Sequence, residues 1–464
     1  MTTTTISSEA ANTVDTRNGG AMNSAFLEYY RCPEDLASFA LMAPVFDSEG
    51  YFRFGSEAIC YGQCSSTFPS KDMTGQLYNT LRDVAADGAT LQLPFIPSDI
   101  VTNLRYERYA RGNGTRGNMA LLFKAYYLAR PFLTTSIRQR IQRLALKGWQ
   151  DIPFPQWPLD STVERILEKL LALLLKACRL ERIPFIWFWP EGSSSCAIMT
   201  HDVETLAGRN FCSSLMDLDS AYAIKSSFQV IPEQRYSVPV SFLDEIRGRG
   251  FEINVHDLNH DGHLFRDRKQ FLSRAQRINR YGRKYGASGF RSAVLYRNPE
   301  WYGALDFAYD MSVPNVGHLE AQRGGCCSIT PFFIEKILEL PVTTTQDYSL
   351  FYVLKDYSIN LWKRQMRRIT AKHGLASFIV HPDYVLESRA RDTYKSLLAY
   401  LAECRSEKKL WIALPREVNE WWRARSQMKL VPRGNHWMIE GPESHKARLA
   451  YAVLEGDGVR YEQA

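Results

Sequence analysis

Short apolar runs alternate with longer amphipathic segments through the second half of the chain, and this alternation limits the fold more than any other feature. Short runs bounded by turn residues are typical of strands buried in a parallel sheet, and strands that alternate with helices predict βαβ units. About seven or eight such units between residues 191 and 424 predict an α/β fold with a distorted (β/α)7–8 barrel rather than an open sheet. The expected strands lie at residues 196–200, 226–231, 251–255, 289–294, 308–312, 337–341, 377–380 and 410–414. The expected helices include residues 240–249, 264–285, 359–372 and 392–406.

The chain on either side of this barrel, which is expected to span residues 191–424, has a different composition. Residues 1–22 are rich in Thr, Ser, Asn and Gly, which predicts disorder. Residues 425–464 contain two apolar segments separated by turns with Gly and Pro, which predicts a small C-terminal β extension. Residues 23–190 are expected to form a mixed α/β accessory domain, with short strands at 51–66 and helices at 99–110, 118–128, 134–146 and 163–180.

The expected compartment is the cytoplasm. The N-terminal residues are polar and lack the apolar segment of a secretory signal. The Leu-rich run at 170–175 is flanked by charged residues and is far shorter than the roughly 20 residues that span a bilayer. The nine cysteines lack paired spacing, so they predict neither a disulfide framework nor a structural zinc site. The adjacent Cys326 and Cys327 are expected to be reduced, buried thiols.

Histidines and acids concentrate in two stretches that each begin as an apolar run, residues 196–204 and 251–263. Four of the nine histidines lie in these stretches. Ligands of parallel α/β folds bind where the strands end, so the polar ends of both stretches are expected to share one pocket. The residues that this pocket would gather are His201, Asp202, Glu204, His256, His260 and His263.

His256 and His260 have an HxxxH spacing that suits a metal site. Their rings would face the same side of a helix, or would converge on one ion from a loop that leaves a strand. Imidazole suits zinc and other first-row divalent metals, and a third ligand would come from Glu204 or Asp202. Two His and one carboxylate with an open coordination position form a hydrolytic arrangement. The Glu that follows the first His in HExxH metalloproteases is absent.

Five segments of the second half, taken in order, resemble one known family. They are THDVE at 200–204, HDLNH at 256–260, GFRSAVLYRNPEW at 289–301, FAYDMSVPN at 307–315 and FIVHPDY at 378–384. The pattern is similar to the polysaccharide deacetylase family, the chitooligosaccharide deacetylase homology domain of the carbohydrate esterase family 4 type. The resemblance covers about half of the chain. It implies a distorted (β/α)7 barrel and a hydrolase that removes N- or O-linked acetyl groups from sugars and acts on carbon–nitrogen bonds other than peptide bonds.

The resemblance also implies roles for individual residues. Asp202 would be the general base and Arg291 would orient it. His381 would be the general acid, and Asp310 could orient His381. These roles agree with the chemistry of the side chains, because an arginine beside a carboxylate holds it ionised and a histidine can protonate a leaving group near neutral pH.

The metal ligands depart from the family's pattern at one position. The resemblance implies that His256 and His260 bind a divalent metal, with Zn²⁺ as the expected ion. The first motif of the family has two adjacent aspartates, of which the second is a metal ligand. Here Val203 occupies that position and Glu204 follows it. Glu204 would reach the same ion if the strand end bends, or it would point away and leave the metal weakly bound or absent.

The predicted function is removal of an acetyl group from a glycan or a biosynthetic sugar intermediate. Two alternatives stay open: an amidohydrolase that acts on a non-sugar carbon–nitrogen bond, and a non-catalytic glycan-binding or assembly protein that keeps the barrel, which Val203 favours. The basic residues between 266 and 284 are typical of a solvated helix face, but they would also suit an anionic or lipid-carrier-linked sugar. They form no recognisable nucleic-acid-binding motif.

Overall fold

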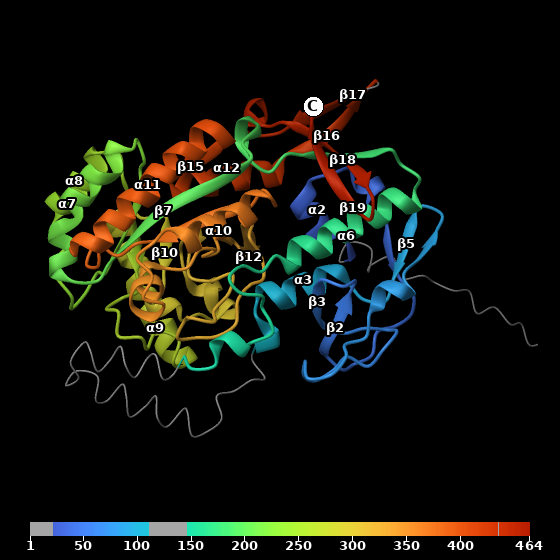
Figure 1. The fold of residues 1–464 in the computed structure, drawn as a ribbon, viewed down its shortest axis with the longest axis horizontal. Coiled ribbons are helices and arrows are strands. Elements are labelled where there is room, and N and C mark those ends of the chain that lie inside the picture. Colours follow the sequence, from blue (N-terminus) through green and yellow to red (C-terminus); the bar gives the residue numbers. More distant parts are fainter. Residues whose placement is uncertain (1–21, 111–145, 435) are drawn as a thin grey trace, which may run out of the picture.

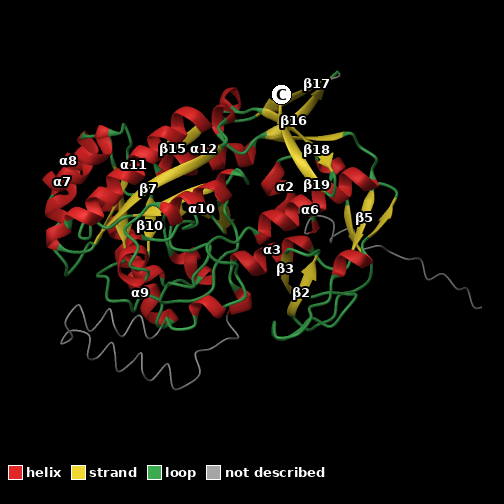
Figure 2. Cartoon of the chain, in the orientation of Figure 1, coloured by secondary structure: helices red, strands yellow, loops and turns green. Residues whose placement is uncertain are grey.

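The computed structural model describes residues 22–110, 146–434 and 436–464 (Figure 1). The helices expected at 118–128 and 134–146 and the disorder expected at 1–22 fall outside the described residues, apart from Leu146 and Met22. The larger part of the protein is a curved sheet with helices on its outside, and a second group of helices and strands lies next to it (Figure 2). The mixed α/β class expected from the sequence is therefore confirmed.

One curved sheet of nine strands organises the larger part. Its strands follow the order β12-β13-β11-β10-β9-β8-β7-β14, and β15 also pairs with β7. All neighbouring strands are parallel except β12 and β13. The strands are β7 (Ser195–Val203), β8 (Ser227–Val230), β9 (Glu252–His256), β10 (Gly289–Arg291), β11 (Tyr309–Asp310), β12 (Phe332–Ile334), β13 (Ile337–Glu339), β14 (Leu375–Ile379) and β15 (Leu410–Ala413).

The sheet is a curled half-barrel rather than a closed ring. Among the described residues its end strands β12 and β14 do not pair with each other. Every strand expected from an apolar run is present, and only β12 lacks an expected counterpart. All nine residues of β7 are buried, because this strand pairs with β8, β14 and β15 in a sheet that is covered on both faces.

The helices of the larger part are α7 (Leu206–Ala221), α8 (Val240–Gly248), α9 (Arg268–Tyr285), α10 (Asn360–Thr370), α11 (Ser388–Lys408) and α12 (Pro415–Gln427). Helices α7 to α11 pack their apolar faces against the sheet, and the apolar face of α12 belongs to the core shared with the N-terminal and C-terminal parts. The helices expected at 240–249, 264–285, 359–372 and 392–406 correspond to α8, α9, α10 and α11. The bounds of α9 have local causes: the Asp267 side chain accepts a hydrogen bond from the Gln270 amide at 2.8 Å, and Gly286 ends the helix with φ +56°.

The N-terminal and C-terminal parts of the described chain share one apolar core. In this core β18 pairs with β6 on one side and with β19 on the other, and the Tyr30 and Tyr461 hydroxyls lie 2.8 Å apart. The N-terminal elements are α2 (Ser24–Tyr30), β1 (Phe39–Leu41), β2 (Gly50–Phe54), β3 (Ala58–Gly62), β4 (Ala85–Asp87), β5 (Thr90–Leu93), α3 (Pro97–Arg105), α6 (Thr162–Ala177) and β6 (Arg182–Ile186). The C-terminal strands are β16 (Lys429–Arg433), β17 (His436–Glu440), β18 (Leu449–Glu455) and β19 (Gly458–Gln463).

The C-terminal strands are antiparallel, as expected, but they do not form a separate unit. Strands β18 and β19 complete a sheet that begins with β6 in the accessory part, which no local pattern in residues 425–464 indicates. All nine cysteines carry free thiols, and Cys326 and Cys327 are buried. Within the described residues, no helix combines the length and the apolar character needed to cross a bilayer.

Arg425 joins three of these segments, so its loss is expected to destabilise the protein. Its buried guanidinium donates to the carbonyl oxygens of Tyr29, Ile186 and Trp187 at 2.7, 2.7 and 2.9 Å. Arg425→Ala would leave these buried acceptors unpaired and lower the free energy of unfolding by about 3 kcal/mol. Urea denaturation checks this, with Arg460→Ala on the exposed edge of β19 as the control. Equal midpoints for the two variants would show that Arg425 does not join these segments.

Candidate metal centre and active site

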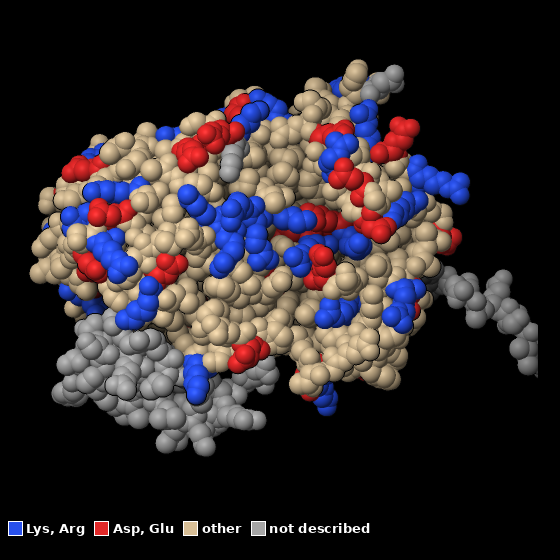
Figure 3. Space-filling model, viewed as in Figure 1, with Lys and Arg blue, Asp and Glu red and all other residues tan. Residues whose placement is uncertain are grey.

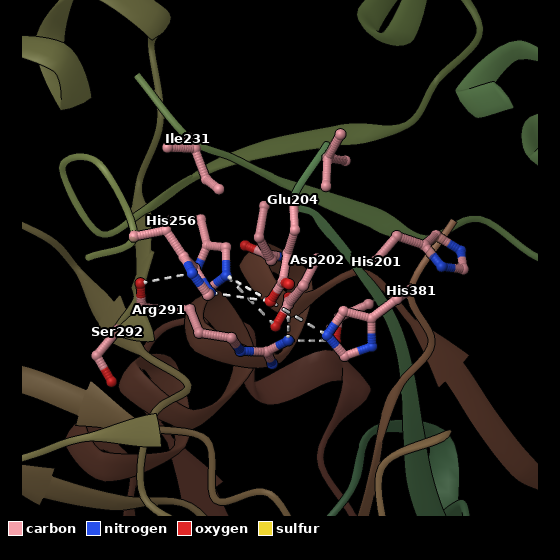
Figure 4. Close-up of polar contacts among 12 residues, drawn as sticks. His201, Asp202, Glu204, Ile231, His256, Arg291, Ser292 and His381 are labelled. Carbon is pink, nitrogen blue, oxygen red and sulfur yellow. Dashed lines mark hydrogen bonds and ion pairs between the residues drawn. The ribbon is translucent and has the colours of Figure 1, made fainter. Parts of the chain in front are cut away.

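Four strands bring chemically active side chains to one edge of the sheet. Asp202 lies near the end of β7, His256 and Arg291 are the last residues of β9 and β10, and His381 follows β14 by two residues. These strands are parallel, so their carboxyl ends meet at the same edge. In Figure 4 these four side chains converge with Glu204 on one point, whereas His201 points away from them.

Glu204, His256 and His260 form a candidate metal centre. One ligand atom of each side chain lies within 4.8 Å of those of the other two. The His260 Nε2 is 2.9 Å from Glu204 Oε1, and the His256 Nε2 is 3.9 Å from the same oxygen. Burial opposes the charged form of Glu204, but His260, together with His256 and His381, outweighs burial and holds the pKa of the carboxyl well below its usual value. An ionised carboxylate beside two imidazoles is a ligand set that suits Zn²⁺.

The imidazole nitrogens of this centre are free to coordinate a metal ion. The His256 Nδ1 lies 3.2 Å from the Arg291 carbonyl oxygen, which can only accept, so Nδ1 carries the proton and Nε2 keeps its lone pair. The His256 Nε2 and both ring nitrogens of His260 are buried and make no hydrogen bond of good geometry, although the His260 Nε2 lies close to Glu204 Oε1. Since buried polar atoms are rarely left unpaired, these nitrogens fit a bound cation.

Strand alternation explains how Glu204 joins the centre. Successive side chains of a strand point to opposite faces, so Asp202 and Glu204 share a face and Val203 lies on the other. Val203 is fully buried in the apolar core between the sheet and its helices. The Glu204 side chain is 26% exposed, which makes it the point where the centre meets solvent. The Glu204 carboxylate therefore lies on the side of the chain where the two histidines are.

The HxxxH segment is a loop rather than a helix. His256 ends β9, and residues 257–263 follow it in turns and bends. Asp257 and His260 adopt φ values of +53° and +54°, a region that non-glycine residues seldom occupy. Such backbone costs about 1–3 kcal/mol for each residue and gathers at functional sites. His263, a further candidate ligand, has a side chain that is 44% exposed, and it lies 3.7 Å from Asp261 rather than at the centre.

His201 belongs to the opposite face of β7. Its Nδ1 lies 2.9 Å from the Val380 carbonyl oxygen, and its Nε2 lies 3.1 Å from Asp219 of α7. Asp219 also accepts from the Ser226 hydroxyl at 2.6 Å. The ring is thus fully bonded between the sheet and its helices, and it takes no part in the candidate site.

Asp202 and Arg291 form a buried ion pair beside the metal centre. The Arg291 Nη1 lies 2.7 Å from Asp202 Oδ1 and donates to the Thr200 hydroxyl at 2.7 Å. The Arg291 Nε donates to the Met311 carbonyl oxygen at 3.0 Å, which fixes the guanidinium. Burial alone would raise the pKa of Asp202, but Arg291, together with His256 and His381, outweighs burial and lowers it. Asp202 Oδ2 lies 3.8 Å from His256 Nε2, so an ionised carboxylate stands next to the candidate metal position.

His381 is held by Asp347, not by Asp310. The His381 Nδ1 lies 2.6 Å from Asp347 Oδ1, and the His381 amide donates to Asp347 Oδ2 at 2.7 Å. Burial opposes protonation of the ring, but Asp347 and Glu204 together outweigh it and raise the pKa of His381 well above its usual value. The His381 Nε2 lies 3.5 Å from Glu204 Oε1 and faces the centre.

The expected role of Asp310 is therefore wrong. Its carboxylate accepts from the Ser312 amide and hydroxyl at 2.9 and 2.8 Å, and Asp310 is the register partner of Glu339 on β13. Both carboxyls are fully buried; burial raises the pKa of each, and the neighbouring Asp310 raises that of Glu339 further, so the pair is bonded to itself and to Ser312 rather than to His381. Asp347 was missed because it lies in the loop after β13, well beyond the strand end that sequence reasoning searches.

A clamp connects the loops that carry Glu204 and His381. Thr205, which follows Glu204, donates its hydroxyl hydrogen to Asp383, which lies two residues after His381. The Gly208 amide donates to both Asp383 Oδ1 at 3.0 Å and Thr205 Oγ1 at 3.2 Å. This approach requires glycine, because a Cβ on Gly208 would lie 2.7 Å from both carboxylate oxygens of Asp383. Sequence reasoning missed the clamp, although Thr205 is a recognisable helix N-cap.

Three of the seven basic residues of α9 pair with acidic side chains. Arg274 forms two hydrogen bonds of 2.7 Å with Asp261, Arg283 lies 3.2 Å from Asp306, and Arg277 pairs with Glu233. Basic and acidic side chains are interspersed over much of the face in Figure 3. These ion pairs favour the solvated-face interpretation of the segment over a site for an anionic sugar.

Several solved structures resemble the larger part of this chain. One is a protein assigned as a polysaccharide deacetylase from Mycobacterium smegmatis, at 16% identity over 54% of this chain and 98% of that chain, with a TM-score of 0.42. Another is Puue allantoinase, at 11% identity over 51% and 92%, with a TM-score of 0.41. A third is a family 4 acetyl xylan esterase from Clostridium thermocellum in complex with a cobalt ion, at 12% identity over 49% and 91%, with a TM-score of 0.30.

The family that the five sequence motifs resemble is thus represented among these structures. No family model matches the chain, and no curated protein matches it. Because the identities are low and the TM-scores are below 0.5, the functional conclusion depends on the site residues themselves.

The clamp predicts that Gly208→Ala disturbs the metal centre. The added methyl group would push Asp383 away and separate the two loops, and loss of such supporting contacts lowers metal affinity by about tenfold or more. Competition with a coloured chelator measures the Zn²⁺ affinity. Gly248→Ala is the matched control, since a Cβ there would have no atom within 4 Å. The same Zn²⁺ affinity in both variants would mean that the clamp does not support the centre.

Proposed function

We propose that this protein is a metal-dependent hydrolase that removes an acetyl group from a carbohydrate. The observation that carries the proposal is the gathering, at one edge of the sheet, of a carboxylate held ionised, a set of two imidazoles and one carboxylate, and a histidine held by a second carboxylate. Hydrolysis of an acyl group needs a base for water, an electrophile for the carbonyl oxygen and an acid for the leaving group. The three parts of this cluster meet those needs.

The electrophile would be a divalent metal held by Glu204, His256 and His260. When bound there, Zn²⁺ would polarise the acyl carbonyl and make a nearby water more acidic. The protein's own contribution is to keep these ligands oriented, through the hydrogen bond from His256 to the Arg291 carbonyl and the clamp beside Glu204.

Asp202 would act as the general base. Its carboxylate is ionised because Arg291 holds it so, and its Oδ2 faces the side of the pocket where His256 Nε2 lies. From there it can take a proton from a water that attacks the acyl carbon. The hydrogen bonds from Arg291 to Asp202 and to Met311 prevent the carboxylate from turning away.

His381 would act as the general acid. Asp347 fixes the ring through Nδ1, so Nε2 is the atom that faces the reacting group. With its pKa raised, the ring is protonated at neutral pH and can give its proton to the departing amine or alkoxide. Asp202 and His381 then carry complementary charges, which is the pattern expected of a base and an acid in one site.

The two alternative functions predict different arrangements of the site residues or different substrates. A non-catalytic barrel predicts that Asp202, His256, His260 and His381 are scattered, and their convergence disfavours it. An amidohydrolase with a non-sugar substrate would use the same cluster, so only a substrate panel separates it from a sugar deacetylase. The resemblance of the five sequence motifs favours the sugar.

The decisive experiment compares wild type with Asp202→Asn on acetylated saccharides. Without the base, acetate release should fall by about 10²–10⁴-fold. The Zn²⁺ content, measured by elemental analysis, should stay the same because Asp202 is not a ligand. Asp244→Asn on the exposed face of α8 is the control and should release acetate at the wild-type rate. Equal rates in wild type and Asp202→Asn would refute this mechanism.

The pH dependence tests the acid. Asp347→Asn removes the carboxylate that raises the pKa of His381, so the pKa of the ring falls and the ring loses its proton at lower pH. The alkaline limb of the kcat profile should move to lower pH, with kcat reduced by about 10–100-fold. Asp310→Asn, which removes the carboxylate first expected in this role, should leave the limb where it is. If the alkaline limb moved in Asp310→Asn and stayed in place in Asp347→Asn, Asp310 rather than Asp347 would be the residue that orients His381.

A further inference from the structure

Three tyrosines gather beside His381 at the candidate site. The Tyr384 ring centroid lies 4.8 Å from that of His381, and it lies 5.0 Å from Tyr352 and 5.9 Å from Tyr348. The rings of Tyr348 and Tyr352 are 5.6 Å apart. All three residues are half-buried rather than fully covered. They form a continuous aromatic cluster that reaches from the proposed acid to the surface.

The segments that hold the acid also carry this cluster. Tyr384 follows His381 by three residues, and its amide donates to the His381 carbonyl oxygen at 3.1 Å. Tyr348 directly follows Asp347 and precedes a π-helical turn, Ser349–Val353, which contains Tyr352. Such turns are rare and occur often at functional sites. The position of the cluster is therefore fixed relative to the reacting groups by the chain that positions those groups.

Exposed apolar residues extend the cluster at the rim of the site. Leu386 is 40% exposed and follows Tyr384 by two residues. Leu206 is 52% exposed and follows Glu204 by two residues. The clamp between Thr205 and Asp383 connects the two loops that carry these leucines. Single exposed leucines need no explanation, but apolar and aromatic side chains beside one group of polar site residues are typical of a ligand-binding surface.

We propose that Tyr348, Tyr352 and Tyr384 form a platform that binds a pyranose ring of the substrate saccharide next to the acetyl group. This inference rests on the proposed function and adds the surface that recognises the sugar. A tyrosine offers an apolar ring face, against which the C–H face of a pyranose packs, and a hydroxyl at its edge for the sugar hydroxyls. The cluster contributes no charged group, so it suits a neutral hydroxylated ring better than a phosphate.

The test measures binding and turnover separately, with chitin-derived N-acetyl and xylan-derived O-acetyl oligosaccharides as probes. Loss of one ring contact of about 0.5–1.5 kcal/mol should weaken binding by up to about tenfold. Tyr352→Ala and Tyr348→Ala should therefore raise KM by that factor and change kcat less. Tyr352→Phe, which keeps the ring, should recover most of the affinity. Tyr384 is left intact because its ring contacts His381.

Controls separate this inference from the proposed function. Tyr78→Ala, at an exposed tyrosine of the accessory part, should leave KM unchanged, and thermal melting checks that each variant is folded. Calorimetric titration of the oligosaccharides into Asp202→Asn measures affinity without turnover. If the saccharides are deacetylated and the Tyr→Ala variants keep the wild-type KM, the platform is refuted and the function stands. If they bind in a tyrosine-dependent way but release no acetate, the function fails and the platform stands. If wild type binds none of the probes, the platform is refuted.

Discussion

The two faces of β7 carry opposite chemistry, and the arrangement of the site follows from this alternation. Thr200, Asp202 and Glu204 point to the inner face, where Arg291 and the two histidines meet them. His201 and Val203 point outward, into the layer between the sheet and its helices. A slip of the strand by one residue would exchange the two sets and put a valine at the metal position. The burial of Val203 and the bonds of His201 to Asp219 and Val380 prevent that slip.

The buried charges of the site are better explained by chemistry than by stability. Removing Asp202 and Arg291 from water costs several kcal/mol for each ion, and their attraction in the interior only partly offsets this cost. One terminal nitrogen of Arg291 is buried without a hydrogen-bond partner, which adds to the cost. Apolar burial elsewhere supports the fold, above all in the core that α6 shares with β6 and the C-terminal strands. The ion pair keeps a carboxylate ionised in a place from which solvent is largely excluded.

Much of this arrangement follows from local sequence patterns. Each apolar run predicted its strand, and polar residues that follow such runs converge because parallel strands end at one edge. A period of two also predicts that Glu204 lies on the face of Asp202, and oxygens of the two carboxylates lie 3.9 and 3.8 Å from the His256 Nε2. Helix α7 left a signal as well, since Cys212, Leu215 and Met216 recur at helical spacing after the Thr205 cap. No local sequence pattern predicts the role of Asp347 or the pairing of β18 with β6, because both depend on contacts between distant segments of the chain.

The replacement of the family's second aspartate by Val203 and Glu204 is consistent with an intact ligand set. An aspartate at position 203 would need the backbone to turn before its carboxylate could face the histidines. Glu204 follows Val203 and lies on the face of Asp202, where its Oε1 is 2.9 Å from the His260 Nε2. The loop that follows Glu204 is held by hydrogen bonds among Thr205, Asp383 and Gly208. These bonds keep the separation between Glu204 and the proposed acid His381 fixed. A motif search that requires two adjacent aspartates would reject this chain, although Glu204 places a carboxylate beside His256 and His260, where these three residues could hold a metal ion.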